Sequence, residues 1–114
     1  MSSQSGVQVV SHVVAISRRA VRVEVEGELD LASSPQLERV LNREIAAGND
    51  VVLDLSRVEF MDCSGLRAIL WAASESRCNG RQLKRTSSSS AQVRRLIEMA
   101  GVGDALPVVF DEGE

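Results

Sequence analysis

The segment VVLDLSRVEFMDCSGLRAIL, residues 51–70, joins a strand pattern directly to a helix pattern. Residues 51–55 are a near-continuous apolar run, which is typical of a strand buried on both faces of a sheet. From residue 65 to about residue 77, apolar side chains recur at helical spacing until Asn79 and Gly80 end the pattern. The segment therefore predicts a buried strand that leads through a short loop into an amphipathic helix.

The residues before this segment predict a hairpin and a helix. Residues 7–16 and 21–25 are rich in β-branched and apolar side chains, and the polar residues 17–19 separate them as a turn. In the second run three valines alternate with charged residues, which indicates a strand with one buried face. A helix begins near Pro35, where the preceding serines can cap it, and ends at Gly48.

The residues after the segment predict a short strand, a further helix and a last short strand. Residues 82–86 contain one strongly apolar side chain, and residues 106–110 form the last apolar run. Between them lies a helix that the serines at 87–90 can cap and that ends at Gly101. Alternating strands and helices predict an α/β fold, with a mixed four- to five-stranded sheet and three to four packed helices. This pattern leaves the strand order open.

Length and composition bound the kind of protein. A chain of 114 residues is expected to form a single domain, 1–114, with a core at about residues 7–110. The hydrophobic fraction of 44% and charged fraction of 25% argue against disordered, collagen-like and coiled-coil proteins. No apolar stretch approaches the roughly 18 residues of a membrane helix, and no signal peptide is recognisable. Two cysteines are too few for a disulfide scaffold, so we expect a reducing cytoplasm.

Charge is distributed unevenly along the chain. The formal net charge of -3 does not favour general attraction to nucleic acid or anionic lipid. Residues 77–95 nevertheless carry five arginines, one lysine and no acid, whereas residues 96–114 carry five acids and no base. Solvated faces produce such runs more often than binding sites do, and a nucleotide or nucleic-acid site at residues 77–95 would rest on charge alone.

Catalytic and metal-binding motifs are absent from the sequence. His12 is the sole histidine and lies inside an apolar strand pattern, where a half-buried side chain is its ordinary role. The sequence has no GxSxG, HExxH, GxGxxG or P-loop motif and no cluster of metal ligands. The sequence therefore offers no candidate catalytic residue and no candidate metal or cofactor site.

Ser64 stands between the predicted strand and the predicted helix, where the first backbone N–H groups of the helix need acceptors. Its hydroxyl can cap the helix. A hydroxyl at this junction also lies near the surface, where another protein can reach it. Both interpretations follow from position alone.

Three blocks of the sequence, in order, resemble one family. DLSRVEFMDCSGLRAIL, residues 54–70, resembles the signature of the STAS domain of bacterial anti-sigma factor antagonists. GELDLASSPQL, residues 27–37, is similar to the turn of that family into its first helix. VRRLIEMAGV, residues 93–102, is similar to its third helix and terminator. The resemblance covers most of the chain and implies a single STAS domain.

The resemblance also implies a partner-switching function without catalysis. In such families the unphosphorylated antagonist binds an anti-sigma factor, usually a serine kinase, and the sigma factor is released for transcription, often in a stress response. The kinase phosphorylates the serine before the glycine, which is Ser64 here, and a PPM-type phosphatase reverses the reaction. Such a protein is cytoplasmic and contacts neither nucleic acid nor a membrane directly. Its oligomeric state stays open.

Five further predictions concern the surroundings of Ser64. Asp30 either faces the kinase or forms the turn before the first helix. Asp62 either orients Ser64 or favours the positive end of the helix. Gly65 leaves space for a partner to approach the hydroxyl, and Arg67 points away from the apolar stripe as an interface candidate. Cys63 replaces the small residue of many relatives and is counted with the partner-binding residues. Its thiol is either redox-sensitive at the helix start or buried and inert, and the inert thiol is favoured.

Two other residues of this helix carry weaker predictions. Leu66 belongs to the apolar stripe and is expected in the core. Trp71 falls off that stripe, and a second packed edge is favoured over an exposed binding anchor. Residues 82–90 depart from the more apolar strand and proline-containing turn of relatives, so no functional residue is carried over from there.

An alternative function belongs to another class of protein. The same domain occurs as a subunit of lipid-transport ABC complexes, where it acts as a structural clip and the serine is no regulatory phosphosite. The well-matched blocks at residues 27–37 and 54–70 favour the antagonist.

Overall fold

The computed structural model describes residues 10–109, which form five strands and three α-helices. In chain order these elements are β1 (Val10–Ser17), β2 (Ala20–Leu29), α1 (Ser34–Ala46), β3 (Asp50–Met61), α2 (Cys63–Cys78), β4 (Leu83–Thr86), α3 (Ala91–Ala100), the short 3-10 helix η1 (Gly103–Ala105) and β5 (Val108–Val109). The alternation confirms the predicted α/β class.

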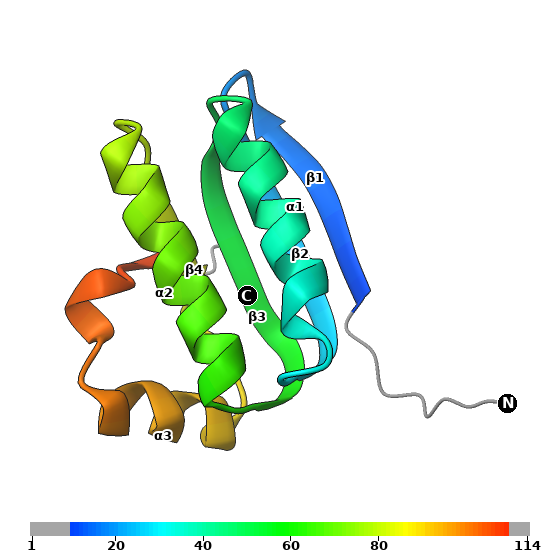
Figure 1. Ribbon diagram of the computed structural model, residues 1–114, viewed down its shortest axis with the longest axis vertical. Coiled ribbons are helices and arrows are strands. Elements are labelled where there is room, and N and C mark those ends of the chain that lie inside the picture. Colours follow the sequence, from blue (N-terminus) through cyan, green and yellow to red (C-terminus); the bar gives the residue numbers. More distant parts are fainter. Residues whose placement is uncertain (1–9, 110–114) are drawn as a thin grey trace, which may run out of the picture.

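The strands form one mixed sheet in the order β1-β2-β3-β4-β5. β1 and β2 form the predicted antiparallel hairpin, and the remaining neighbours pair in parallel. β2 and β3 run in the same direction, and their carboxyl ends, Leu29 and Met61, are paired at one edge of the sheet (Figure 1). β4 is shorter: residues 83–85 pair with residues 51–53, so β4 ends beside the middle of β3. The loops that leave β2 and β3 therefore start next to each other at that edge.

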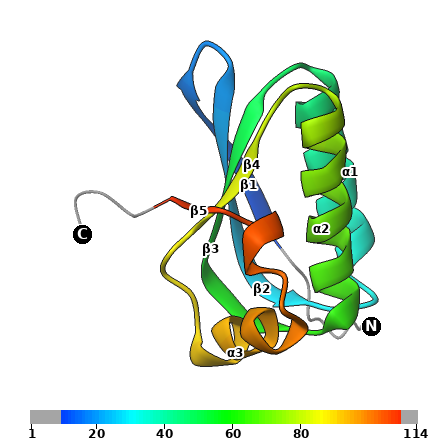
Figure 2. The ribbon, with the colours of Figure 1, turned by 90° about the vertical axis from the view of Figure 1, so that its left-hand side faces the viewer.

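The helices α1 and α2 cover one face of the sheet, and α3 lies at its end (Figure 2). On β2 the valines at 21, 23 and 25 are buried beneath the helices, as their alternation predicts. Among residues 10–109 no helix covers the opposite face, which is named the bare face (Figure 2). The largest fully buried side chains form the core: Leu29, Leu37, Leu41, Leu53, Leu55, Met61, Ile69, Leu106, Val23, Val25, Val51 and Val58.

The segment at residues 51–55 is buried on the core face and largely buried on the opposite face. Val51, Leu53 and Leu55 face the core, whereas on the other face Asp54 is buried and Val52 is partly buried. The strand also continues to Met61, further than predicted. Its pairing with β2 shifts between Glu24 and Glu26, which breaks the simple alternation that a sequence pattern can reveal.

Other predicted boundaries are close to those observed. The helix predicted at residues 65–77 begins two residues earlier, and the strand predicted at 82–86 is present as β4. Of the strand predicted at residues 106–110, only Val108–Val109 is extended, and residue 110 lies outside the described residues. Residues 7–9 of the predicted hairpin also lie outside them.

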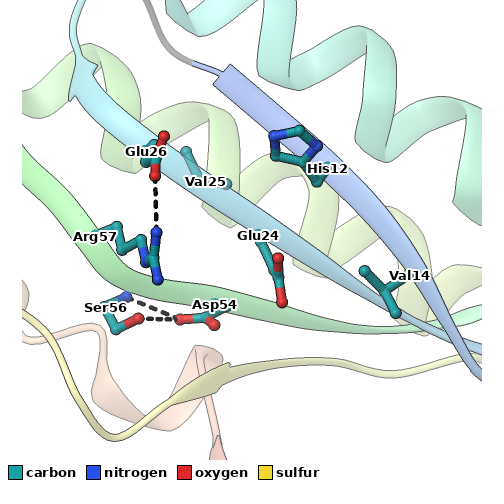
Figure 3. Close-up of a pocket in the computed structure, with 8 residues that line it drawn as sticks. All are labelled: His12, Val14, Glu24, Val25, Glu26, Asp54, Ser56 and Arg57. Carbon is teal, nitrogen blue, oxygen red and sulfur yellow. Dashed lines mark hydrogen bonds and ion pairs between the residues drawn. The ribbon is translucent and has the colours of Figure 1, made fainter.

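The bare face holds a network of charged side chains around Asp54 (Figure 3). The Asp54 carboxylate accepts hydrogen bonds from the Ser56 hydroxyl at 2.6 Å, the Ser56 amide at 2.9 Å and the Arg22 guanidinium at 2.7 Å. Burial alone raises the pKa of Asp54, but the hydrogen bonds from Ser56 and Arg22 outweigh it and hold that pKa below its ordinary value. Nearby, Arg57 donates to Glu26 at 3.0 Å.

His12 belongs to the same face and is exposed, which corrects the expectation of a half-buried core histidine. It lies on β1, opposite Glu24 of β2 (Figure 3). Its position in an apolar strand pattern suggested burial, but β1 is the outermost strand and neither face of it is well covered. Val14 and Ile16 of β1 are likewise exposed.

We expect Asp54→Asn to lower the free energy of unfolding by about 1–3 kcal/mol near pH 7, because it weakens a buried charge-assisted network. Since the folded-state pKa is depressed, this stabilisation is present above the unfolded pKa and is lost as pH falls through the folded pKa. Urea unfolding of both proteins between about pH 7 and pH 2 measures the difference. Glu59→Gln, at an exposed acid on the same strand, should change stability by less than about 0.5 kcal/mol. A difference that persists unchanged at the lowest pH would contradict this explanation.

Candidate functional site

The loop between β3 and α2 lies beside the end of β2. Leu29 and Met61 are paired at the carboxyl ends of the two strands. The amide of Asp62 donates a hydrogen bond of 3.1 Å to the carbonyl oxygen of Leu29. This bond fixes the start of α2 against β2 and places Ser64 at the edge where the strands end.

Asp62, and not Ser64, caps α2. The Asp62 carboxylate accepts hydrogen bonds from the amides of Ser64 at 2.9 Å and Gly65 at 3.1 Å. The prediction that the Ser64 hydroxyl caps the helix is therefore wrong, because the aspartate two residues earlier already satisfies these N–H groups. The Ser64 side chain is partly exposed, and its hydroxyl has no hydrogen-bond partner within residues 10–109.

Gly65 is buried where α2 passes close to β2. A Cβ atom at this position would lie 2.7 Å from the Leu29 carbonyl oxygen, 2.8 Å from Leu29 Cγ and 3.1 Å from Met61 Cγ. We expected the missing side chain to leave space for a partner, but the space is needed inside the protein. Leu66, on the next residue, is buried in the core as predicted.

Asp30 forms the turn between β2 and α1. Its Oδ1 accepts hydrogen bonds from the amides of Ala32 at 3.0 Å and Ser33 at 3.1 Å and from the Ser33 hydroxyl at 3.1 Å. This geometry supports the turn-forming interpretation of Asp30. Ser33 stands at the N-cap of α1 but makes no side-chain cap bond. Its hydroxyl donates to the carbonyl of Glu28 at 2.8 Å, and its oxygen accepts from the amide of Asp30 at 3.0 Å. The next residue after Asp30, Leu31, is 75% exposed.

Three side chains of α2 close to Ser64 are exposed. Cys63 is exposed, which corrects the expectation of a buried thiol. Arg67 is also exposed, as predicted. Trp71 is 49% exposed, which overturns the preference for a packed edge. Arg67 and Trp71 line a groove of about 230 Å³ together with Glu38 and Asn42 of α1.

Helix α3 is joined to the same loop by one side chain that sequence reasoning missed. The Gln92 amide accepts a hydrogen bond from the Met61 amide at 2.9 Å and donates one of 2.8 Å to the Met61 carbonyl. Ser90 caps α3 by accepting from the Val93 amide, which confirms a capping role within the serine run. No local sequence pattern predicts the contact of Gln92, because its partner Met61 is 31 residues away along the chain.

Within residues 10–109, no helix combines the length and apolar character needed to cross a membrane. No group of three or more histidine, cysteine or acidic side chains in that range is placed to hold a metal ion. Two nucleophilic side chains lie next to each other at this edge: the exposed thiol of Cys63 and the partly exposed hydroxyl of Ser64.

Sequence comparison places the chain in one family. The model of the STAS domain family matches residues 11–114. Among curated proteins, no sequence matches this chain.

Solved structures with the same fold include two anti-sigma factor antagonists. SpoIIAA in its unphosphorylated form has a TM-score of 0.76 and 22% identity, with 90% of each chain covered. The phosphorylated form of SpoIIAA from Bacillus has a TM-score of 0.70 and 20% identity, with 90% of this chain and 94% of that chain covered. An antagonist from Mycobacterium paratuberculosis has a TM-score of 0.74 and 24% identity, with 88% and 84% covered.

A membrane transporter contains the fold as well. The murine anion transporter SLC26A9 has a TM-score of 0.66 and 18% identity, and the match covers 87% of this chain but 19% of that chain. At such identities these likenesses show the fold and not the function.

We expect Gly65→Ala to lower the free energy of unfolding by about 1–3 kcal/mol, because the added methyl group meets the backbone oxygen of Leu29. Gly103→Ala is the matched control, since a Cβ atom there has no neighbour within 4 Å. Thermal or urea unfolding of both variants checks the difference. Equal stability of the two variants would show that the approach of α2 to β2 is not tight.

We expect Asp62→Ala to destabilise the protein by about 1 kcal/mol, because the amides of Ser64 and Gly65 lose their acceptor. Asp62→Asn keeps a capping oxygen and should retain most of the stability. Chemical unfolding measures both changes. If Asp62→Asn and Asp62→Ala were equally destabilised, the charge at the helix end and not the cap bond would be responsible.

Proposed function

The chain belongs to the STAS domain family, and we propose that it is an anti-sigma factor antagonist regulated by phosphorylation of Ser64. In this proposal the unphosphorylated protein binds a kinase-type anti-sigma factor in the cytoplasm and thereby frees a sigma factor. The anti-sigma factor phosphorylates Ser64, and a PPM-type phosphatase restores the hydroxyl. The protein itself catalyses nothing.

The single observation that carries the proposal is the state of the Ser64 hydroxyl. It is partly exposed on the first turn of α2 and has no hydrogen-bond partner in the described part of the chain. Asp62 holds the backbone on both sides of it, so the hydroxyl is presented by a fixed turn. A kinase needs such an accessible, well-positioned acceptor, whereas a serine used for capping would be occupied.

Residues around Ser64 offer a surface for the partner. Leu31 is exposed in the neighbouring turn that Asp30 shapes. Arg67 and Trp71 lie three and seven residues after Ser64 on α2, at the spacing of one helix face. An exposed aromatic side chain, an arginine and an apolar side chain are residue types that anchor protein interfaces.

Phosphorylation adds roughly -1.5 to -2 charges and three acceptor oxygens at Ser64. The Asp62 carboxylate already accepts from the amides of Ser64 and Gly65, so these two donors are not available to the phosphate. The carboxylate also repels the new dianion. The phosphate is therefore directed outward, into the volume that a docked partner occupies. A loss of about 3–4 kcal/mol of binding energy corresponds to a hundredfold to thousandfold weaker complex.

A structural clip in a transport complex is the second candidate. The likeness to SLC26A9 supports it, because that protein is a membrane transporter that contains the fold. A clip does not require a free serine hydroxyl on an exposed turn. The unoccupied hydroxyl of Ser64 thus favours the antagonist over a clip for a lipid-transport ABC complex.

We expect Ser64→Ala to bind the anti-sigma factor with the same affinity as the unphosphorylated wild type. Addition of ATP should not weaken this binding, because the variant has no hydroxyl at position 64. Ser64→Asp should bind about a hundredfold more weakly, since it places a negative charge in the interface. Calorimetry with each kinase-type anti-sigma factor of the same cell measures binding, and intact mass with peptide mapping locates the phosphate.

Ser88→Ala is the matched control for phosphorylation, because Ser88 is an exposed serine away from α2. It should accept one phosphate as the wild type does. Equal labelling of wild type and Ser64→Ala would assign the phosphate to another residue. Absence of both labelling and binding, together with copurification of an ABC-type ATPase, would favour the structural clip.

A further inference from the structure

Two arginines from different elements face one hollow beyond β4. Arg85 lies on β4 and Arg94 on α3. Together with Ser87, Glu98 and Val108 they line a hollow of about 280 Å³. Two arginines of the basic stretch at residues 77–95 therefore line the same hollow.

Arg85 is held in this hollow without an acceptor. Its side chain is partly buried, and the Nε atom is buried with no hydrogen-bond partner within residues 10–109. Burial lowers the pKa of Arg85, because desolvation disfavours the charged form. No acid of the described part of the chain forms an ion pair with Arg85 or Arg94. A buried guanidinium N–H that lacks an acceptor costs free energy.

The framework around both arginines is fixed before any ligand arrives. The Arg85 amide donates to the Pro107 carbonyl at 2.9 Å, and Arg85 pairs with Val108 of β5. The Arg94 guanidinium donates to the Ser89 carbonyl at 2.7 Å. This leaves further N–H groups of each guanidinium for another acceptor, since an arginine side chain carries five.

We infer that this hollow binds an oxyanion, the phosphate or carboxylate group of a ligand, between the guanidinium groups of Arg85 and Arg94. Arginine suits such groups because its planar fork can donate two parallel hydrogen bonds to them. Ser87 also lines the hollow, and a serine hydroxyl can donate a further hydrogen bond. Glu98 is the one acid of the lining, so its charge should weaken the binding. This site is independent of Ser64 and of the proposed switch.

Two sources share the required chemistry. One is a small phosphate-bearing or carboxylate-bearing molecule from solution. The other is the chain's own acidic stretch at residues 111–114, which begins two residues after Val109. Val109 pairs with Thr86, next to Arg85, and an extended chain covers about 3.3–3.6 Å per residue, so these carboxylates are within reach of the hollow.

The test is a titration of the full chain with inorganic phosphate, followed by nuclear magnetic resonance of the arginine Nε–H groups. Ionic strength is held constant with chloride, so that general screening does not change. We expect saturable shifts of the Arg85 and Arg94 signals. Arg94→Gln should weaken binding about fivefold or more, whereas Glu98→Gln should tighten it. Arg95→Gln, at an exposed neighbour outside the lining, is the matched control and should change binding less than about twofold.

A second variant distinguishes the two sources. It carries Asp111→Asn, Glu112→Gln and Glu114→Gln, which neutralise the acidic stretch. If phosphate binds clearly more tightly to this variant, the chain's own carboxylates occupy the hollow in the wild type. If phosphate binds both proteins equally, the ligand comes from solution.

Two results would overturn the inference. One is the absence of saturable shifts at Arg85 and Arg94 in both proteins, with no change of these signals when the acidic stretch is neutralised. The other is an equal loss of binding in Arg94→Gln and Arg95→Gln, which would mean diffuse attraction to a basic surface and not a site.

Discussion

The carbonyl oxygen of Leu29 positions the loop between β3 and α2, where Ser64 lies. It accepts the amide of Asp62, and it stands so close to α2 that the helix can pass only with a glycine at position 65. That approach fixes the first turn of α2, which Asp62 then caps. The exposed hydroxyl of Ser64 therefore follows from a backbone contact between two parallel strands and a helix.

Much of this arrangement follows from local sequence patterns, and the remainder depends on neighbours that such patterns do not reveal. The run at residues 51–55 and the helical spacing after residue 65 predicted β3 and α2 because both depend on periodicity. The full length of β3 was missed because an irregular pairing leaves Ser56 and Arg57 both exposed. Helical spacing placed Trp71 off the main stripe, but whether another element covers it depends on the packing of α1.

The chemistry of the site also divides in this way. Family resemblance pointed to Ser64, yet the roles of its neighbours depend on which atoms they reach. Gly65 was expected to leave space for a partner, but its missing side chain lets α2 approach β2. Of the two roles considered for Asp62, the structure shows the one at the start of the helix. A switch built on such a framework does not require refolding, because the framework survives while only the charge displayed on it changes. In that respect the proposed mechanism differs from switches that order or melt a segment.

Two hydrogen bonds between Gln92 and Met61 join α3 to the end of β3, next to the loop that leads to Ser64. α3 also carries Arg94, which lines the hollow. The same helix therefore contacts both the hollow and Met61, the residue before Asp62. Thermodynamic linkage then imposes a symmetry on any communication between them. If a ligand in the hollow alters the affinity of the surface around Ser64 for a partner, that partner must alter the affinity of the hollow for its ligand by the same factor. With such coupling, an anion in the hollow would change partner binding, and partner binding would equally change how tightly the hollow holds the anion.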